Sequence, residues 1–306
     1  MFKIIKKIIS PTIESIKTGL SEVGDKIWLR SKTAIAWTDV TFNVVWGCTK
    51  VSAGCKNCYA ANLAHARGFG GPSKKRPFIW GKSGDTASGK GWVVEQGRRV
   101  FPEKYWSKLL EWNARARKNN QIVTVFISSM TDVFEDHPIT RRELEKFWAI
   151  VRQTPWLHYQ ILTKRAGNIR SCLPADWFGF DNGYPNVWLG VTVENQAVAH
   201  RFDNILADIP APVRFISYEP AIGALHIERM DKLDWLIAGG ESGPNRRPFD
   251  HDWARDIHRD CEANDVAFFY KQDTAFRSST NPYLDGVKHY NFPMPRESKS
   301  RVAQAA

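Results

Sequence analysis

Seven short apolar runs constrain the fold of this 306-residue chain more than any other feature. They cover residues 44–46, 122–127, 158–162, 186–191, 213–216, 234–238 and 266–270. Helix-forming segments follow all but one of them, and the clearest predicted helices cover residues 59–67, 107–117, 141–152, 195 to about 206, and 251 to about 262. Residues 221–232 look more like a loop. Apolar strands that alternate with helices are typical of a parallel sheet covered by helices. We therefore predict an α/β fold, a complete or partial (βα) barrel of the TIM type. A flat doubly wound sheet is the alternative, but no glycine-rich nucleotide turn follows the first run.

Three of the five cysteines, Cys48, Cys55 and Cys58, lie within eleven residues after the first run. This spacing favours a metal site, because a disulfide would leave one thiol over and the loop is too polar for cysteines that only pack in a core. A closed zinc site would need a fourth ligand such as His65. A [4Fe-4S] cluster held by three cysteines would keep one iron open for a substrate or cofactor. The position of the loop after a predicted strand, where barrel enzymes keep their chemistry, favours the cluster.

Polar side chains follow the other apolar runs. Because the carboxyl ends of barrel strands meet at one rim, we expect these side chains to face the three cysteines. They are Ser128, Asp132, Lys164, Thr192, Glu194, Glu219, Glu241 and Lys271.

Much of the net charge of +11 lies between Arg67 and Lys118, where thirteen Lys or Arg residues stand against four acids. A glycine-rich insert at about residues 68–105 overlaps this segment, and four tryptophans lie among the charges: Trp80, Trp92, Trp106 and Trp112. Cations that meet phosphates and rings that stack on bases are typical of nucleic-acid binding, although an ordinary solvated basic face has the same charge. We predict a nucleic-acid partner for this segment.

The chain divides into a basic, amphipathic extension at residues 1–31 and a barrel at residues 32–306. We favour an amphipathic arm that packs on the barrel; the alternatives are a helix that binds a partner protein or a membrane surface, and a poorly ordered extension. No apolar run approaches the roughly eighteen residues that span a bilayer. Because no signal peptide is recognisable either, we expect a cytoplasmic protein.

Several motifs occur in order between about residues 34 and 292. They are Trp37-Thr38-Asp39 with Phe42-Asn43, Gly47-Cys48-Thr49-Lys50-Val51-Ser52, Gly54-Cys55-Lys56-Asn57-Cys58-Tyr59-Ala60, Ser128-Ser129-Met130-Thr131-Asp132-Val133-Phe134, Leu162-Thr163-Lys164-Arg165, Val187-Trp188-Leu189-Gly190-Val191-Thr192-Val193-Glu194-Asn195-Gln196, Ser217-Tyr218-Glu219-Pro220, Gly239-Gly240-Glu241-Ser242-Gly243 and Leu284-Asp285-Gly286. With these motifs the chain resembles the phage-associated three-cysteine family of radical-SAM-like proteins, which is distantly similar to spore photoproduct lyase. SAM is S-adenosylmethionine.

The resemblance implies a radical SAM barrel, in which three cysteines hold a [4Fe-4S] cluster and the fourth iron chelates SAM. An electron from a donor such as flavodoxin or ferredoxin would then release a 5'-deoxyadenosyl radical that abstracts hydrogen from the substrate. Barrel position assigns the residues at three strand ends to SAM. Its amino group is assigned to Ser128, Ser129 and Asp132, its ribose to Thr192, Glu194 and Asn195, and its methionine or adenine to Gly239, Gly240 and Glu241. The substrate is assigned to Lys164 and Glu219 as catalytic residues. Two features depart from the usual radical SAM pattern: six residues separate Cys48 from Cys55, and Asn57 replaces an aromatic residue before Cys58.

Three functions follow from these observations. The cluster and the basic segment together predict a radical SAM enzyme that repairs or modifies a base in nucleic acid. One alternative is a zinc-dependent barrel hydrolase that uses Asp132, Glu194, Glu219 and Glu241 with His158 around a metal-bound water. The other is a non-catalytic binding module in which a metal only staples the fold.

Overall fold

The computed structural model describes residues 33, 35–70, 76–82 and 84–296. The predicted amphipathic extension at residues 1–31 lies outside the described residues. Within them, no helix is both long enough and apolar enough to cross a membrane.

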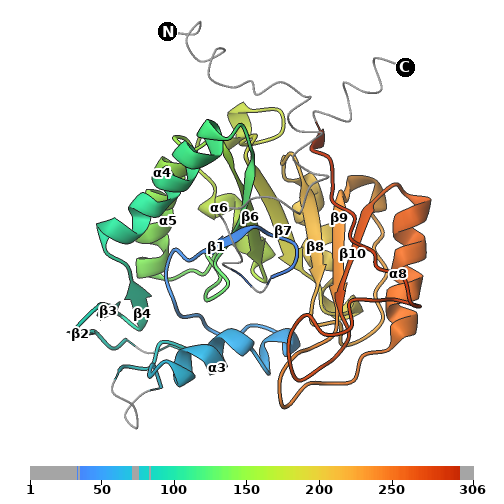
Figure 1. The fold of residues 1–306 in the computed structure, drawn as a ribbon, viewed down its shortest axis with the longest axis horizontal. Helices are drawn as coiled ribbons and strands as arrows, with labels where there is room; N and C mark the ends of the chain where they lie inside the picture. The colour runs from blue at the N-terminus through green and yellow to red at the C-terminus, as the bar shows by residue number, and fades with distance from the viewer. Residues whose placement is uncertain (1–32, 34, 71–75, 83, 297–306) are drawn as a thin grey trace, which may run out of the picture.

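Seven parallel strands form one curled sheet, in the order in which they occur along the chain (Figure 1). They are β1 (Val40–Phe42), β5 (Val123–Ile127), β6 (Leu157–Thr163), β7 (Val187–Thr192), β8 (Arg214–Tyr218), β9 (Trp235–Gly239) and β10 (Ala267–Gln272). The sheet curls through 202°, which makes it a half-barrel. Its order lacks the reversal of a doubly wound sheet. The predicted α/β fold is confirmed, and the half-barrel is compatible with the partial form of the predicted barrel.

The predicted first strand at residues 44–46 is wrong. The first strand of the half-barrel is β1, which ends at Phe42. Val44 and Val45 are fully buried, so their apolar character reflects packing in a loop. Trp46 instead forms an isolated antiparallel bridge with Arg99.

Helices cover the convex face of the sheet. The long ones are α4 (Glu103–Lys118), α5 (Pro138–Val151) and α8 (His251–Ala263), each close to a predicted helix, whereas α3 (Tyr59–Ala66) lies apart from the sheet, below it in Figure 1. The helix predicted from residue 195 to about 206 is wrong as a single element. There the chain forms the short α7 (His200–Asp203) between two 3-10 turns, Gln196–Val198 and Leu206–Asp208. The turn α6 (Ile169–Cys172) follows β6, and residues 221–232 are mostly loop, as expected.

Side chains alternate between the two faces of each strand, because successive residues of a strand point to opposite sides. The large core on the convex face includes Val125, Ile161, Leu189, Ile216 and Leu236. A second core fills the concave face near the amino ends of the strands; it comprises Trp37, Phe126, Trp188, Val213, Phe215, Trp235, Ile237 and Phe269. One step further along the strands come the polar residues of the rim.

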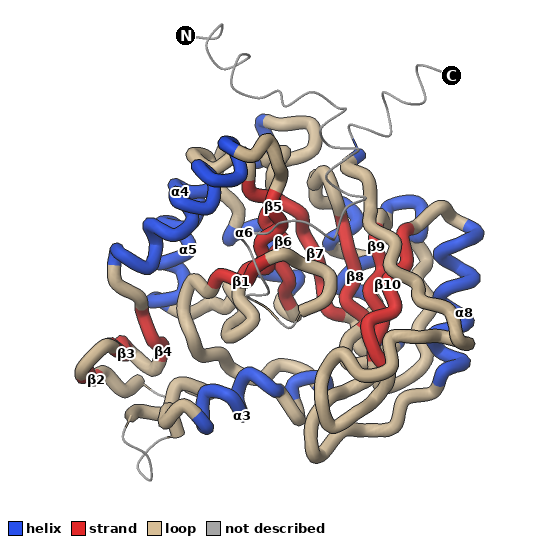
Figure 2. The backbone as a smooth tube through the Cα atoms, in the orientation of Figure 1, coloured by secondary structure: helices blue, strands red, loops and turns tan. Residues whose placement is uncertain are grey.

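The basic insert contains a small antiparallel sheet of β2 (Ala87–Gly89), β3 (Trp92–Glu95) and β4 (Arg98–Val100), which stands away from the half-barrel in Figure 2. Trp80 is 7% exposed and Trp106 only 2%. All four tryptophans between Arg67 and Lys118 were expected to offer their faces to bases. This expectation is wrong for Trp80 and Trp106, because they are core residues.

Candidate functional site

The loop from Gly47 to Cys58, here named the cysteine loop, crosses the carboxyl rim of the half-barrel. It begins at a position that only glycine fits: Gly47 has φ +114°, and a Cβ there would lie 2.3 Å from the carbonyl oxygen of Ile79. All three cysteines of the loop are free and half-buried. Contacts with three strand ends hold the loop in place.

The first contact is with Glu135, which follows β5. Its Oε1 accepts a hydrogen bond of 2.9 Å from the backbone N–H of Thr49, the residue after Cys48. Arg98 donates two hydrogen bonds of 2.9 and 2.8 Å to the same carboxylate, and both side chains are almost fully buried. Arg165 adds a longer ion pair of 3.4 Å.

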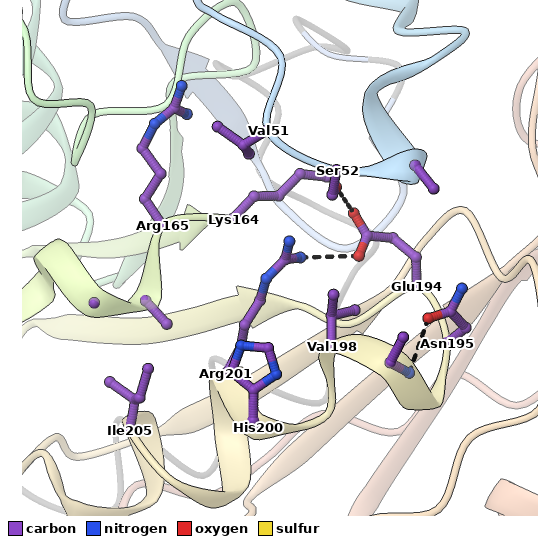
Figure 3. A pocket seen from close by; sticks show the side chains of 14 residues that line it. Val51, Ser52, Lys164, Arg165, Glu194, Asn195, Val198, His200, Arg201 and Ile205 are labelled. Atoms are coloured by element: carbon purple, nitrogen blue, oxygen red, sulfur yellow. Dashed lines mark hydrogen bonds and ion pairs between the residues drawn. The ribbon is translucent and has the colours of Figure 1, made fainter.

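The second contact is with Glu194, which follows β7 (Figure 3). Its Oε1 accepts a hydrogen bond of 2.6 Å from Ser52 Oγ, and its Oε2 accepts one of 2.8 Å from Arg201. Gly54, next to Cys55, lies directly against this carboxylate, since a Cβ at that position would be 2.2 Å from Glu194 Oε1. The side chains of Glu194 and Arg201 are only 2% and 8% exposed.

The third contact is with Glu241, which follows β9. Its Oε2 accepts a hydrogen bond of 3.0 Å from Nδ2 of Asn57, the residue immediately before Cys58. Arg247 donates to both oxygens of the same carboxylate and also, at 2.9 Å, to the carbonyl oxygen of Ala53. Burial alone would raise the pKa of Glu241, but the hydrogen bonds from Arg247 and Asn57 bring that pKa below its ordinary value.

These three contacts share one design, which we name the carboxylate–arginine anchors: Glu135 with Arg98, Glu194 with Arg201, and Glu241 with Arg247. Each carboxylate takes one bond from the cysteine loop and at least one from an arginine. A buried carboxylate needs such a partner, because an unpaired charge there would be costly. The anchors hold the loop at a backbone N–H, a hydroxyl and an amide, and none of these bonds uses a sulfur atom.

Asp132 was predicted to bind SAM, but the structure shows four protein donors at its carboxylate. Oδ1 accepts from the N–H of Phe134 and from Thr163 Oγ1, and Oδ2 accepts from the N–H of Lys164 and from Arg165. The residue therefore ties the end of β5 to the end of β6.

The other predicted cofactor contacts also lie at strand ends. Ser128 Oγ accepts from the N–H of Val44, Ser129 Oγ accepts from Asn43, the Thr192 carbonyl oxygen accepts from Arg201, Asn195 caps the turn that precedes α7, and the Gly240 N–H donates to the carbonyl oxygen of Gln272. Gly239 makes room for a neighbour, since a Cβ there would come within 3.2 Å of Glu219 Oε1.

The two predicted catalytic residues both have partners at the rim. Lys271 Nζ lies 2.6 Å from Glu219 Oε1 in a pair whose side chains are 18% and 12% exposed. Ser217 Oγ donates at 3.4 Å to the other oxygen of Glu219. Lys164 Nζ donates to Thr192 Oγ1 at 3.2 Å.

A pocket of about 510 Å³ opens between the cysteine loop and the ends of β6 and β7 (Figure 3). Val51, Ser52 and Ala53 of the loop form one wall. The remaining lining includes Lys164, Arg165, Glu194, Asn195, Val198, His200, Arg201 and Ile205. The Glu194–Arg201 anchor and the predicted catalytic Lys164 thus line the same pocket.

Cys48 lies close to a cation. Its Sγ is 3.5 Å from Arg165, which also pairs with Asp132. Burial, followed by the charge of Asp132, nevertheless raises the pKa of the Cys48 thiol to about 12. The thiol is therefore neutral at pH 7 unless a metal displaces its proton.

The candidate ligands of a single metal ion do not converge in this structure. Across the described residues, no three His, Cys, Asp or Glu side chains, the three cysteines of the loop included, are placed to hold one metal ion. His65 is exposed on α3, seven residues and therefore about 10 Å along the helix from Cys58. His158 lies at the amino end of β6, roughly 16 Å of strand away from the rim carboxylates.

Sequence reasoning found the cysteines and two anchor carboxylates but missed Glu135, Asn57 and the anchor arginines. The one available signal was their spacing: Arg201 follows Glu194 by seven residues, and Arg247 follows Glu241 by six.

A family model described as "Protein of unknown function (DUF5131)" matches residues 32–304. This range includes the whole cysteine loop and all three anchors. Neither the curated proteins nor the solved structures include a significant match. Because the matched range covers nearly the entire sequence, the chain belongs to the DUF5131 family.

Proposed function

We propose that this protein is a radical SAM enzyme whose cysteine loop binds a [4Fe-4S] cluster at the rim of the half-barrel. One observation carries the proposal: three half-buried thiols stand on one loop over the carboxyl ends of parallel strands, and each has an anchor bond within three residues. The carboxyl ends of such strands are where barrel enzymes place their chemistry.

The donor set fits a three-thiolate cluster better than a single ion. In an iron-sulfur cluster each thiolate binds a different iron, so its ligands need not converge on one point. A structural zinc ion needs four ligands around one centre, and His65 is too far along α3 to supply the fourth. The anchors also suit a cluster, because they fix the course of the loop with polar groups and keep the sulfur atoms out of those bonds.

The residues around the loop would orient a ligand and exclude water. Bound together, the cluster and SAM would supply a carbon-centred radical able to abstract hydrogen from an unactivated position. Lys164 and the Glu219–Lys271 pair present charged groups on the rim that can hold polar parts of a cofactor or substrate. Beneath them, the aromatic core around Trp188 and Trp235 closes the floor of the half-barrel against solvent.

A nucleic-acid substrate agrees with the charge of the protein. Between Arg67 and Lys118 the sequence has an excess of nine positive charges. Residues Lys104, Lys108, Arg115, Arg117 and Lys118 are exposed on α4. Such a surface attracts a phosphate backbone and makes binding depend on salt.

The test is anaerobic reconstitution with iron and sulfide, followed by measurement of iron per chain. Cys55→Ser should lower the iron content strongly, whereas Cys261→Ser should not, because Cys261 is a fully buried core residue on α8. Circular dichroism would confirm that both variants fold. Equal iron content in the two variants, or stoichiometric zinc in the wild-type protein, would contradict the proposal.

A further inference from the structure

Four aromatic rings pack into one group beside the start of the cysteine loop. Trp46 meets Phe69 and Phe101 edge-on, with centroids 6.2 and 5.9 Å apart, and Phe69 meets Trp92 in the same manner at 6.1 Å. Trp46 and Phe69 are only 8% and 1% exposed. Because Trp46 precedes Cys48 by two residues, this group lies next to the proposed cluster site.

Three arginines converge on these rings from three separate segments; we name them the arginine triad. Arg67, which caps the end of α3, lies 5.0 Å from the centroid of Trp46. Arg99 of β4 lies 4.3 Å from the same centroid. Arg76 lies 4.9 Å from the centroid of Phe69 and donates a hydrogen bond of 3.2 Å to the carbonyl oxygen of Arg67.

The charges of the triad are not neutralised within the described residues. The pKa of Arg99 is lowered mainly by burial, and the positive charges of Arg76 and Arg67 lower it further. Arg99 Nε is buried without a hydrogen-bond partner among the described residues. The preceding residue shows the contrast, because Arg98 points to the other face of β4 and pairs with Glu135. Like charges gathered in this way repel one another unless an anion joins them.

We propose that the arginine triad binds backbone phosphates of a nucleic-acid strand beside the cysteine loop. The inference rests on the proposed nucleic-acid substrate and gives it a location. Guanidinium groups match the oxygens of phosphate and donate to them in pairs. The rings below are already packed edge-on or covered by guanidinium groups, so they orient the arginines and do not stack on bases. Recognition at this site therefore does not depend on base sequence.

The test compares two double variants that each remove two positive charges. Arg67→Gln with Arg76→Gln disrupts the triad, whereas Arg259→Gln with Lys288→Gln removes two exposed charges that lie outside the basic segment of residues 67–118. Fluorescence anisotropy with single-stranded oligonucleotides of mixed and uniform sequence gives the affinity at several salt concentrations. Each lost phosphate contact should make the negative slope of log K against log salt shallower by about 0.7. The slope of the triad variant should therefore be shallower by about 1.4. The Arg259/Lys288 variant should keep the wild-type slope.

Three further results decide the inference. Arg67→Lys with Arg76→Lys keeps the charges and should keep most of the slope, and thermal melting shows whether each variant is folded. A folded triad variant with the wild-type slope would overturn the triad site and leave the proposed enzyme intact. A wild-type protein that binds no oligonucleotide would overturn both the triad site and the nucleic-acid substrate, while iron content tests the cluster separately.

Discussion

Replacing Glu194 by alanine tests the anchors at the most deeply buried of their three carboxylates. The change removes the acceptor of Ser52 and leaves the guanidinium of Arg201 buried, and among the described residues the carbonyl oxygen of Thr192 is its one remaining hydrogen-bond partner. Breaking a buried ion pair on one side costs about 3–5 kcal/mol. We expect the free energy of unfolding, measured with urea, to fall by this amount and reconstituted iron to fall with it.

A double variant separates stability from loop position. Glu194→Leu with Arg201→Met removes both charges, and exchanging a buried pair for apolar side chains of similar volume is often neutral or stabilising. We therefore expect most of the lost stability to return. Iron content should stay low, because Ser52 still has no acceptor and the loop around Cys55 is not held.

Asp256→Ala is the control, since Asp256 forms an exposed pair with Arg259 on α8. Its cost should be about 0–1 kcal/mol. If Glu194→Ala costs no more than this control, the argument for a buried anchor fails. If the Leu/Met variant binds as much iron as the wild type, the anchor does not position the loop.

Two further predictions concern single residues. Gly54→Ala should cost roughly 1–3 kcal/mol and lower iron binding, because the new Cβ meets a fixed Glu194 carboxylate; in a Glu194→Ala background the thermal melt should show little added cost. His137 caps α5 by accepting from the N–H of Ile139, and burial and then Arg98 lower the pKa of its imidazole, so the folded protein holds it neutral at pH 7. Its contribution to stability is present above its unfolded pKa of about 6.5 and is lost as the pH falls from that value through the lower folded pKa. In urea unfolding at about pH 7 and about pH 5, the wild type should therefore lose more stability than His137→Asn, which keeps a capping oxygen; equal losses would contradict this assignment.

The sheet was predictable because each buried strand is a short apolar run that ends in polar residues. The same reasoning failed at Val44 and Val45, since an apolar run does not distinguish a strand from a loop packed in a core. It also failed after β7, where a helical pattern became two 3-10 turns and the short α7. Tertiary packing decided both cases.

The cysteines and the rim were predictable from spacing and from parallel-strand geometry, but the anchors were not. Ser52 and Glu194 are 142 residues apart, and Asn57 and Glu241 are 184 apart. No local pattern connects such pairs. Arg98 also looks like its neighbour Arg99 in the sequence, yet one neutralises a buried carboxylate and the other belongs to the unneutralised triad.

The most direct test of the account is whether the reconstituted protein cleaves SAM. Under anaerobic conditions with a chemical reductant, the wild-type protein should form 5'-deoxyadenosine from SAM, and Cys48→Ser, Cys55→Ser and Cys58→Ser should each abolish its formation while Cys172→Ser retains it. A folded wild-type protein that carries zinc or no metal and forms no 5'-deoxyadenosine would contradict the proposed function.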